Sequence, residues 1–259
     1  MVKKRAGFTL IELLVVIAII AILMSILLPA LSKVKLQAQD VIDKSNEHQF
    51  ALIWKLYTDD NDGFFPERGS GTAPDQVNLS AWPNVIWQFM PNTDPDLWCC
   101  PAATNRFDQG ARQPWAAWNT DPTAEPLLIG SYAVNYWVAN YEGGEGAGRD
   151  PGKFWRTPNI KGCAFAPLML DCAWKDIEPE PYNAAPPYNG YWGYYDEDEM
   201  WRACINRHAW KNNMSFLDLS VKAITLKCLW NLDWHKKWED DAFPDGGWPG
   251  WMENLAECY

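Results

Sequence analysis

The chain is short of positive charge, of histidine and of repeated sequence. Its 22 lysines and arginines are outnumbered by 33 acidic residues, and the formal net charge is -11 over 259 residues. Nucleic-acid binding needs a basic face, so we expect no nucleic-acid partner. With only three histidines, the sequence shows no Ser-His-Asp group, no Cys-His pair and no metal-spaced cluster. We therefore predict that the chain is not an enzyme.

The N-terminus lacks the features of an ordinary signal peptide. Such a peptide has a short apolar core followed by a cleavage site of small residues. Here the small residue, Gly7, stands before the apolar core, and no A-x-A pattern follows it. The apolar run from Phe8 to Leu28 is long enough to cross a bilayer as a helix, and its single charge is Glu12. A carboxylate in such a helix normally needs a partner.

The first thirty residues resemble the signal of type IV prepilins and type II secretion pseudopilins. The matching features are three cations at 3–5, the run Gly-Phe-Thr-Leu-Ile-Glu at 7–12, and Pro29. In that family a dedicated peptidase cuts after the glycine and the new N-terminal residue is usually methylated. The resemblance implies cleavage between Gly7 and Phe8. It makes Glu12 the fifth residue of the mature chain and Pro29 a helix-kinking proline.

Glu12 then has a plausible chemical partner. Cleavage exposes a cationic amine on Phe8, and in a helical filament this amine can lie beside Glu12 of a neighbouring subunit. Each charge offsets the desolvation of the other, and the pair fixes the axial register. The implied partners are a prepilin peptidase and methylase, other pilin or pseudopilin subunits in a homo-oligomeric filament, and inner-membrane lipid before assembly.

The sequence predicts an α+β, pilin-like fold, in which a long N-terminal helix packs on an antiparallel sheet with long irregular loops. We expect a leader at 1–7, a transmembrane and filament-core helix at 8–30, an amphipathic helix at 31–57 and a Trp-rich globular domain at 58–259. Residues recurring at three- and four-residue steps predict the helix face that packs on the domain: Leu31, Val34, Ala38, Val41, Ser45, His48 and Leu52. Asp43 and Glu47 fall on the opposite, polar face, and Pro29 should bend or locally melt the helix.

Two functions remain open from the sequence. The first is a structural subunit of a type IV pilus-like or type II secretion filament. The second is a membrane-tethered, Trp-rich adhesin or glycan-binding protein that is exported with a prepilin signal. In both cases the cations before the span keep the N-terminus cytoplasmic, so the domain lies in the periplasm or outside, and at the cell surface after assembly.

Seven cysteines offer disulfides rather than a metal site. The compartment beyond the membrane is oxidising in many bacteria. Cys163 and Cys172 flank an expected strand, and Cys204 and Cys228 flank an expected hairpin, so we treat these four as disulfide candidates. The adjacent pair Cys99-Cys100 lacks the C-x2-C spacing of a zinc site, and the sequence shows no second pair of ligands to complete such a site.

The C-terminal third resembles a group of prepilin-like proteins with an H-x(9)-D-G motif. His208 and Asp218 have nine residues between them, but Leu219 replaces the motif's glycine. Leucine does not favour positive φ, so we expect the turn to take another shape than an Asp-Gly hairpin. No nucleophile accompanies the two residues, and we predict a structural role, such as a hydrogen bond that pins the hairpin.

The expected long helix ends in a turn rich in acids, Thr58 to Pro66. Asp60 and Asp62 resemble half of a calcium loop, but the pattern lacks its first ligand and its closing glutamate. We predict a helix-capping turn and no cofactor, with calcium at Asp60 and Asp62 as the weaker alternative.

Tryptophan is abundant, with 17 residues. Exposed rings can bind sugars, but we expect most of these rings to fill the core of a domain poor in regular structure, or its subunit interfaces. Glycan binding by the long 178–200 loop or by the tail remains a side hypothesis. Strands are predicted at 131–138, 165–171, 214–217 and 221–225, and short helices at 80–90 and 225–238.

Overall fold

The computed structural model describes residues 10–69, 79–90, 95–104, 115–119, 129–143, 149–189, 198–239 and 242–258. The predicted leader, Gly7 and Phe8 lie outside these residues, as does most of the Tyr- and Trp-rich part of the 178–200 loop. The chain divides into two compact units, 1–39 and 40–259. The globular unit therefore begins inside the predicted amphipathic helix, well before residue 58.

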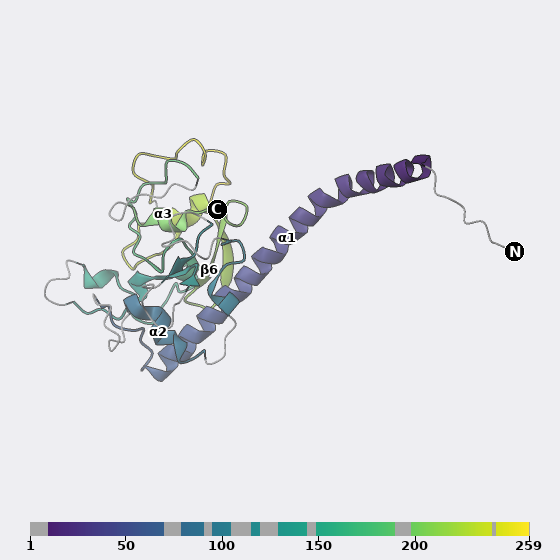
Figure 1. Cartoon of the computed structure of the whole chain (residues 1–259). Coiled ribbons are helices and arrows are strands. Elements are labelled where there is room, and N and C mark those ends of the chain that lie inside the picture. The colour runs from purple at the N-terminus through teal and green to yellow at the C-terminus, as the bar shows by residue number, and fades with distance from the viewer. Residues whose placement is uncertain are drawn as a thin grey trace. The chain divides into compact units, whose positions relative to one another are not determined.

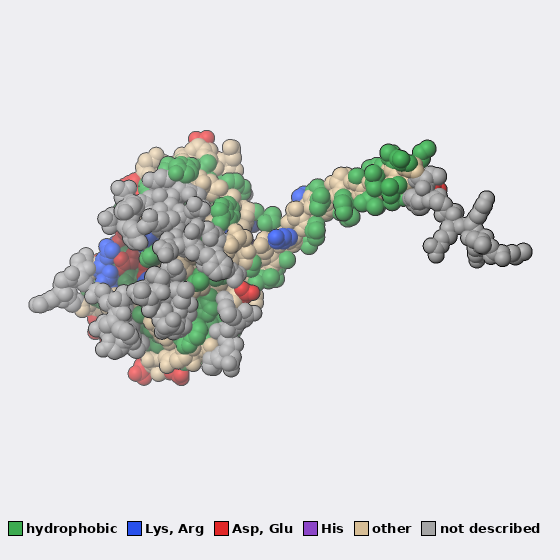
Figure 2. All heavy atoms as spheres, viewed as in Figure 1, with side chains coloured by type: hydrophobic (Ala, Val, Ile, Leu, Met, Phe, Trp, Pro, Cys, Tyr) green, Lys and Arg blue, Asp and Glu red, His purple; other side chains and the backbone are tan. Residues whose placement is uncertain are grey.

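One long helix, α1 (Leu10–Asp60), runs from the first unit into the second (Figure 1). Helix assignment continues through Pro29, so the helix does not melt locally at the proline. Ser32 Oγ donates to the carbonyl of Leu28 at 3.0 Å just beyond it. The predicted membrane span is part of a helix that is long and apolar enough to cross a bilayer. The large apolar side chains of this part are exposed, and they cover the N-terminal end of the helix in Figure 2.

The prediction of which face of α1 packs on the domain is wrong. Val41 is 66% exposed and Leu52 is 43% exposed, and His48 also faces solvent. The buried face begins instead with polar side chains: Asp43, Asn46 and Glu47, followed by Phe50, Ala51, Ile53, Trp54, Tyr57 and Thr58. Buried residues do recur at three- and four-residue steps along α1, but they lie on a different face of the helix from the predicted one. Polar partners in the domain determine that face.

A five-stranded sheet has the order β5-β3-β4-β6-β7. The strands are β3 (Tyr132–Asn135), β4 (Pro167–Asp171), β5 (Asp176–Ile177), β6 (Lys211–Phe216) and β7 (Val221–Thr225). Their pairs are antiparallel except that β5 runs parallel to β3. The sheet is therefore mixed, where the sequence predicted an antiparallel one. The α+β class is confirmed, and the architecture is consistent with a pilin-like fold.

Short elements complete the domain. A two-stranded antiparallel pair is formed by β1 (Trp118–Asn119) and β2 (Ile129–Gly130). The short helices are α2 (Trp82–Trp87) and α3 (Met200–Ala203), with 3-10 turns η1 (Leu79–Ala81), η2 (Pro95–Trp98), η3 (Tyr136–Val138), η4 (Pro151–Lys153) and η5 (Leu226–Asn231). Most predicted elements occur, but the strand predicted at 131–138 ends at residue 135. The helix predicted at 225–238 is reduced to the six-residue 3-10 helix η5.

Leu219 does take the conformation that the motif's glycine would take, so the expectation of a different turn is wrong. Its φ is +68°, in the left-handed region that favours glycine. The N–H of Leu219 donates to the carbonyl of Phe216 at 2.9 Å, and the N–H of Phe216 donates to the carbonyl of Ser220 at 2.9 Å. This is the three-residue hairpin in which a left-handed residue follows a turn. Leu219 also packs against the core, which offsets part of its strain.

The turn that ends α1 is closed by backbone hydrogen bonds. The N–H of Gly63 donates to the carbonyl of Thr58 at 2.8 Å, and Asn61 Nδ2 donates to the carbonyl of Tyr57 at 2.8 Å. Asp62 and Gly63 have positive φ, as a helix C-terminus requires. The predicted capping turn is therefore present. Asp60 and Asp62 are exposed on it.

The tryptophans pack the core and also hold irregular backbone in place. Trp54, Trp82, Trp98 and Trp118 form one aromatic group with Phe50 of α1. Nine described indole N–H groups donate to backbone carbonyl oxygens, those of Trp82, Trp118, Trp137, Trp155, Trp201, Trp230, Trp234, Trp238 and Trp251. Most of these carbonyls belong to loops, where sheet hydrogen bonds are few and other donors are needed.

The observed disulfide joins Cys228 to Cys258. Cys163, Cys172 and Cys204 are free thiols, so the expected pairing within 163–172 and within 204–228 is corrected. Sequence could not find the true partner because Cys258 comes from the irregular C-terminal tail. The bond fastens that tail to η5.

We predict that Cys258→Ser lowers the free energy of unfolding by about 2–4 kcal/mol, the usual effect of losing a disulfide that closes a loop of this size. Chemical denaturation of the purified chain measures the change. Cys163→Ser is the matched control, because Cys163 is a free and partly exposed thiol, and it should change stability by less than about 0.5 kcal/mol. Equal losses in both variants would contradict the observed pairing.

Candidate functional site

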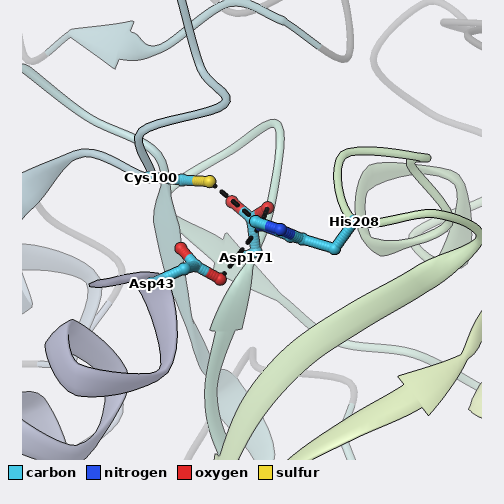
Figure 3. Close-up of side chains that lie close together, drawn as sticks. All are labelled: Asp43, Cys100, Asp171 and His208. Carbon is cyan, nitrogen blue, oxygen red and sulfur yellow. Dashed lines mark hydrogen bonds and ion pairs between the residues drawn. The ribbon is translucent and has the colours of Figure 1, made fainter. Parts of the chain in front are cut away.

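Four chemically active side chains meet inside the globular unit. Asp43 comes from α1, Cys100 from the segment after η2, Asp171 from the end of β4 and His208 from the segment before β6. Figure 3 shows all four pointing toward one another. Each offers one atom to the group, and these atoms all lie within 4.8 Å of one another. We call these four residues the buried cluster.

His208 is the centre of the buried cluster. Its Nε2 lies 3.1 Å from Cys100 Sγ, 3.1 Å from Asp43 Oδ2 and 3.5 Å from Asp171 Oδ2. A single ring nitrogen therefore faces three acceptor atoms at once. All four residues are at most 7% exposed, so water does not compete for these positions.

Outer partners hold the cluster in place. Tyr132 donates its hydroxyl to Asp43 Oδ1 at 2.7 Å, and Asn213 Nδ2 donates to Asp43 Oδ2 at 2.9 Å. Arg207 Nη1 donates to Asp171 Oδ1, and its Nη2 donates to the carbonyl of Ala116 at 2.8 Å. These contacts leave Asp171 Oδ2 without a hydrogen-bond partner among the described residues, although it is buried.

The electrostatics of the cluster follow from its burial. Burial lowers the pKa of His208, but the close approach of the Asp171 and Asp43 carboxylates and their negative charges outweigh it and raise the pKa to about 10. Burial, together with the same two carboxylates, raises the pKa of the Cys100 thiol. Two basic side chains, His208 and Arg207, therefore stand beside the two acidic side chains Asp43 and Asp171, and opposite charges offset the cost of burying one another.

The sequence predicts one motif with a structural role for His208 and Asp218, but the structure places the two residues apart. His208 precedes β6 and Asp218 follows it, so the two motif residues stand at opposite ends of one strand. Asp218 is exposed and accepts from the N–H of Ser220 at 2.9 Å and from its hydroxyl at 2.6 Å. The predicted structural role therefore fits Asp218, which holds the hairpin turn, whereas His208 belongs to the buried cluster.

Three members of the cluster were missed. Asp43 was placed on the solvent face of its helix, Cys100 was judged only by its spacing to Cys99, and Asp171 was the last residue of an expected strand. These residues are too far apart in the chain to form a motif of fixed spacing that the sequence alone would reveal. The available signal was that Asp171 ends a strand of otherwise apolar residues, where an ion needs a partner.

A separate cavity of about 170 Å³ is lined by Tyr136, Asp176, Ile177, Glu178, Glu199 and Arg202. Its charges are paired with one another or with neighbours. Arg202 Nη1 lies 2.6 Å from Glu199 Oε2, and Glu178 is held by Arg149 at 2.7 Å and Arg68 at 3.2 Å. The charged residues that line the cavity are therefore engaged in ion pairs that hold the structure together. None of the described lining residues is an activated nucleophile.

At the other end of the chain, the N-terminal segment matches a known sequence family. The prokaryotic N-terminal methylation motif matches residues 2–28. The chain carries a prepilin-type signal. No curated protein and no solved structure matches the chain. The resemblance of the C-terminal third to H-x(9)-D-G proteins stays a prediction.

The prepilin-type signal supports a general class of protein. It supports an exported protein of the type IV pilin or pseudopilin kind and implies processing by a prepilin peptidase. With the apolar part of α1, it supports a membrane-anchored protein with an exposed domain. It also suggests a structural subunit rather than an enzyme. Calcium at Asp60 and Asp62 remains an untested expectation.

We predict that Glu47→Gln makes the chain more stable at pH 8 than the wild type. Burial, and then the charge of Asp43, raises the pKa of Glu47 well above its usual range. Above the ordinary pKa of a glutamate, only the unfolded chain releases this proton, so wild-type stability falls as pH rises. Glutamine has no proton to release and keeps an oxygen for Ser215 Oγ, which donates to Glu47 Oε2 at 3.0 Å.

Melting temperatures from pH 4 to pH 8 measure this effect. The gap between Glu47→Gln and the wild type should be small at pH 4 and widen toward pH 8. Glu253→Gln is the control, since Glu253 is exposed, and its curve should run parallel to the wild type. A gap for Glu47→Gln that does not change with pH would refute the argument.

We also predict that Asp218→Ala destabilises the domain by about 1 kcal/mol, the net value of a typical hydrogen bond. Asp218→Asn keeps an oxygen acceptor for the N–H of Ser220 and should lose less than half as much. Denaturant unfolding of the two variants measures the difference. Equal losses would mean that the carboxylate charge, and not the turn hydrogen bond, matters.

Proposed function

We propose that this chain is a structural subunit of a type IV pilus-like or type II secretion filament, processed after Gly7 and assembled through its N-terminal helix. The observation that carries the proposal is the methylation motif over residues 2–28, with Glu12 inside an apolar helix. A plain membrane anchor requires neither the acid nor the glycine before the apolar run.

Exposed apolar side chains along α1 support this function. Large apolar residues are exposed from Leu10 to Leu28, and exposed examples continue at Val34, Val41 and Leu56. Within the globular unit, the helix buries polar residues in the domain and leaves Val41, Ile42, Leu52 and Leu56 facing outward. Subunits that pack helix against helix in a filament core would cover such surface.

The Trp-rich adhesin alternative has less support. The described tryptophans are used largely as core residues and as donors to backbone carbonyls, which accounts for their number without a ligand. Glycan binding by the 178–200 loop remains a prediction, because residues 190–197 lie outside the part of the chain that the structure describes.

We predict that Glu12→Ala leaves membrane insertion intact and abolishes filaments, because the amine of processed Phe8 loses its partner in the neighbouring subunit. Ser25→Ala is the matched control in the same helix. Ser25 Oγ donates only to the carbonyl of Ile22 within its own turn, at 2.7 Å, so its loss should leave filaments normal.

Membrane fractionation, electron microscopy of surface filaments and mass spectrometry of methylated Phe8 provide the readouts. Filaments labelled by an antibody to this chain in the wild type and in Ser25→Ala, but not in Glu12→Ala, are the expected result. Normal filaments in Glu12→Ala would exclude the charge pair. A processed wild-type chain that enters no filament would exclude the proposed function itself.

A further inference from the structure

We propose that the buried cluster is a structural binding site for a divalent transition-metal ion of the zinc class, with Asp43, Cys100, Asp171 and His208 as its four ligands. The proposal concerns the globular unit alone and does not depend on the filament function. It rests on ligand geometry, on a buried carboxylate oxygen without a hydrogen bond, on charge and on outer-shell contacts.

The spacing of the ligand atoms fits a tetrahedral site. Bonds of 2.0–2.3 Å from zinc to nitrogen, oxygen and sulfur place tetrahedral ligand atoms about 3.3–3.8 Å apart. His208 Nε2 lies at 3.1, 3.1 and 3.5 Å from its three neighbours in the cluster, and no pair of ligand atoms exceeds 4.8 Å. Small movements of the side chains would bring all these distances to the tetrahedral spacing around an ion.

The hydrogen bonds available inside the cluster do not satisfy it. His208 Nε2 carries at most one proton, and the Cys100 thiol is only a weak donor. Asp171 Oδ2 points into the group and has no hydrogen-bond partner among the described residues, although Asp171 is 1% exposed. Its one close polar neighbour in the cluster is His208 Nε2 at 3.5 Å, and a buried carboxylate oxygen that lacks a hydrogen bond is costly. A cation at the centre would bind this oxygen together with the other three atoms.

The donor set selects the class of metal. Calcium and magnesium prefer oxygen ligands and take six or more of them. A thiolate, an imidazole and two carboxylates suit a borderline ion such as zinc. Four protein ligands fill a tetrahedral shell and leave no position for water or substrate, which is the pattern of a structural site rather than a catalytic one.

The charge balances when the metal is bound. When the metal binds, the Cys100 thiol releases its proton to solvent and becomes a thiolate. A proton on His208 Nε2 is also released, so that this nitrogen can bind the ion. A divalent ion with one thiolate and two carboxylates carries one net negative charge, and Arg207, bound to Asp171 Oδ1, compensates it. The complete group is then neutral, as burial requires.

Outer-shell contacts match those of metal sites. The backbone N–H of Ala102 donates to Cys100 Sγ at 3.3 Å, a contact that stabilises a thiolate. Asp40 Oδ1 lies 3.7 Å from His208 Nδ1, on the ring atom that does not face the cluster. Carboxylates behind ligand histidines orient the ring and raise its basicity. The ion would therefore tie α1 to β4 and to the segment that leads into β6.

Metal analysis of the full-length chain, purified in detergent, tests the proposal. We expect about one zinc per chain, and a cobalt-substituted chain should show tetrahedral visible bands with a thiolate charge-transfer band. A strong chelator should lower the melting temperature, and zinc, but not calcium or magnesium, should restore it. A wild-type chain that neither contains zinc nor binds cobalt in this way would overturn the proposal.

The two adjacent cysteines offer a matched pair of variants. Cys100→Ser should lose the charge-transfer band and weaken zinc binding. Loss of an outer-shell partner weakens metal binding about 10–100-fold, and loss of this ligand should weaken it further. Cys99→Ser should keep both, because Cys99 Sγ lies 3.5 Å from the carbonyl of Ile129 and is not a member of the cluster. Unchanged zinc binding in Cys100→Ser would overturn the assignment.

A second pair of variants applies if Cys100→Ser does not fold. Asp40→Ala should weaken zinc binding by about 10-fold or more, since Asp40 stands behind His208. Asp59→Ala is its control. Both aspartates lie on α1, where Asp59 forms an ion pair with Lys55 and Asp40 forms one with Lys44. A loss confined to Asp40→Ala supports the site, and equal zinc affinity in the two variants overturns it.

Discussion

The burial of Asp43 constrains much of the globular unit. A carboxylate at 0% exposure on a helix is tolerated only where donors or cations surround it. Tyr132 from β3, Asn213 from β6 and His208 supply these contacts. They fix the rotation of α1 about its axis, so the same turn also buries Glu47 and, farther along, places Phe50 and Trp54 in the aromatic core.

This choice of face would allow one helix to hold the domain and to pack in the proposed filament. If α1 packed on the domain through its apolar stripe, that stripe would not be available to other subunits. By burying acids and an asparagine in the domain, the helix keeps Val41, Leu52 and Leu56 on its outer side. The polar contact inside and the apolar surface outside are therefore two consequences of one orientation, and both suit a helix that holds a domain while packing against other helices.

The domain itself compensates for its scarcity of regular structure. Its strands are two to six residues long, so few backbone groups are satisfied within the sheet. Indole N–H groups serve the loop carbonyls, the disulfide fastens the tail, and ion pairs such as Lys153 with Glu180 at 2.5 Å bridge the loops. A metal ion in the buried cluster would add another link of this kind, between segments far apart in the chain.

The sequence alone determined the N-terminal signal, the long helix, the α+β class and the positions of the central strands. These features depend on contiguous residues and short periods. Tertiary structure alone decided which face of α1 is buried, that Cys228 pairs with Cys258, and that Asp43, Cys100, Asp171 and His208 converge. The physical reason is the same in each case: the position of each residue depends on partners that are distant in the sequence and come together only when the chain folds.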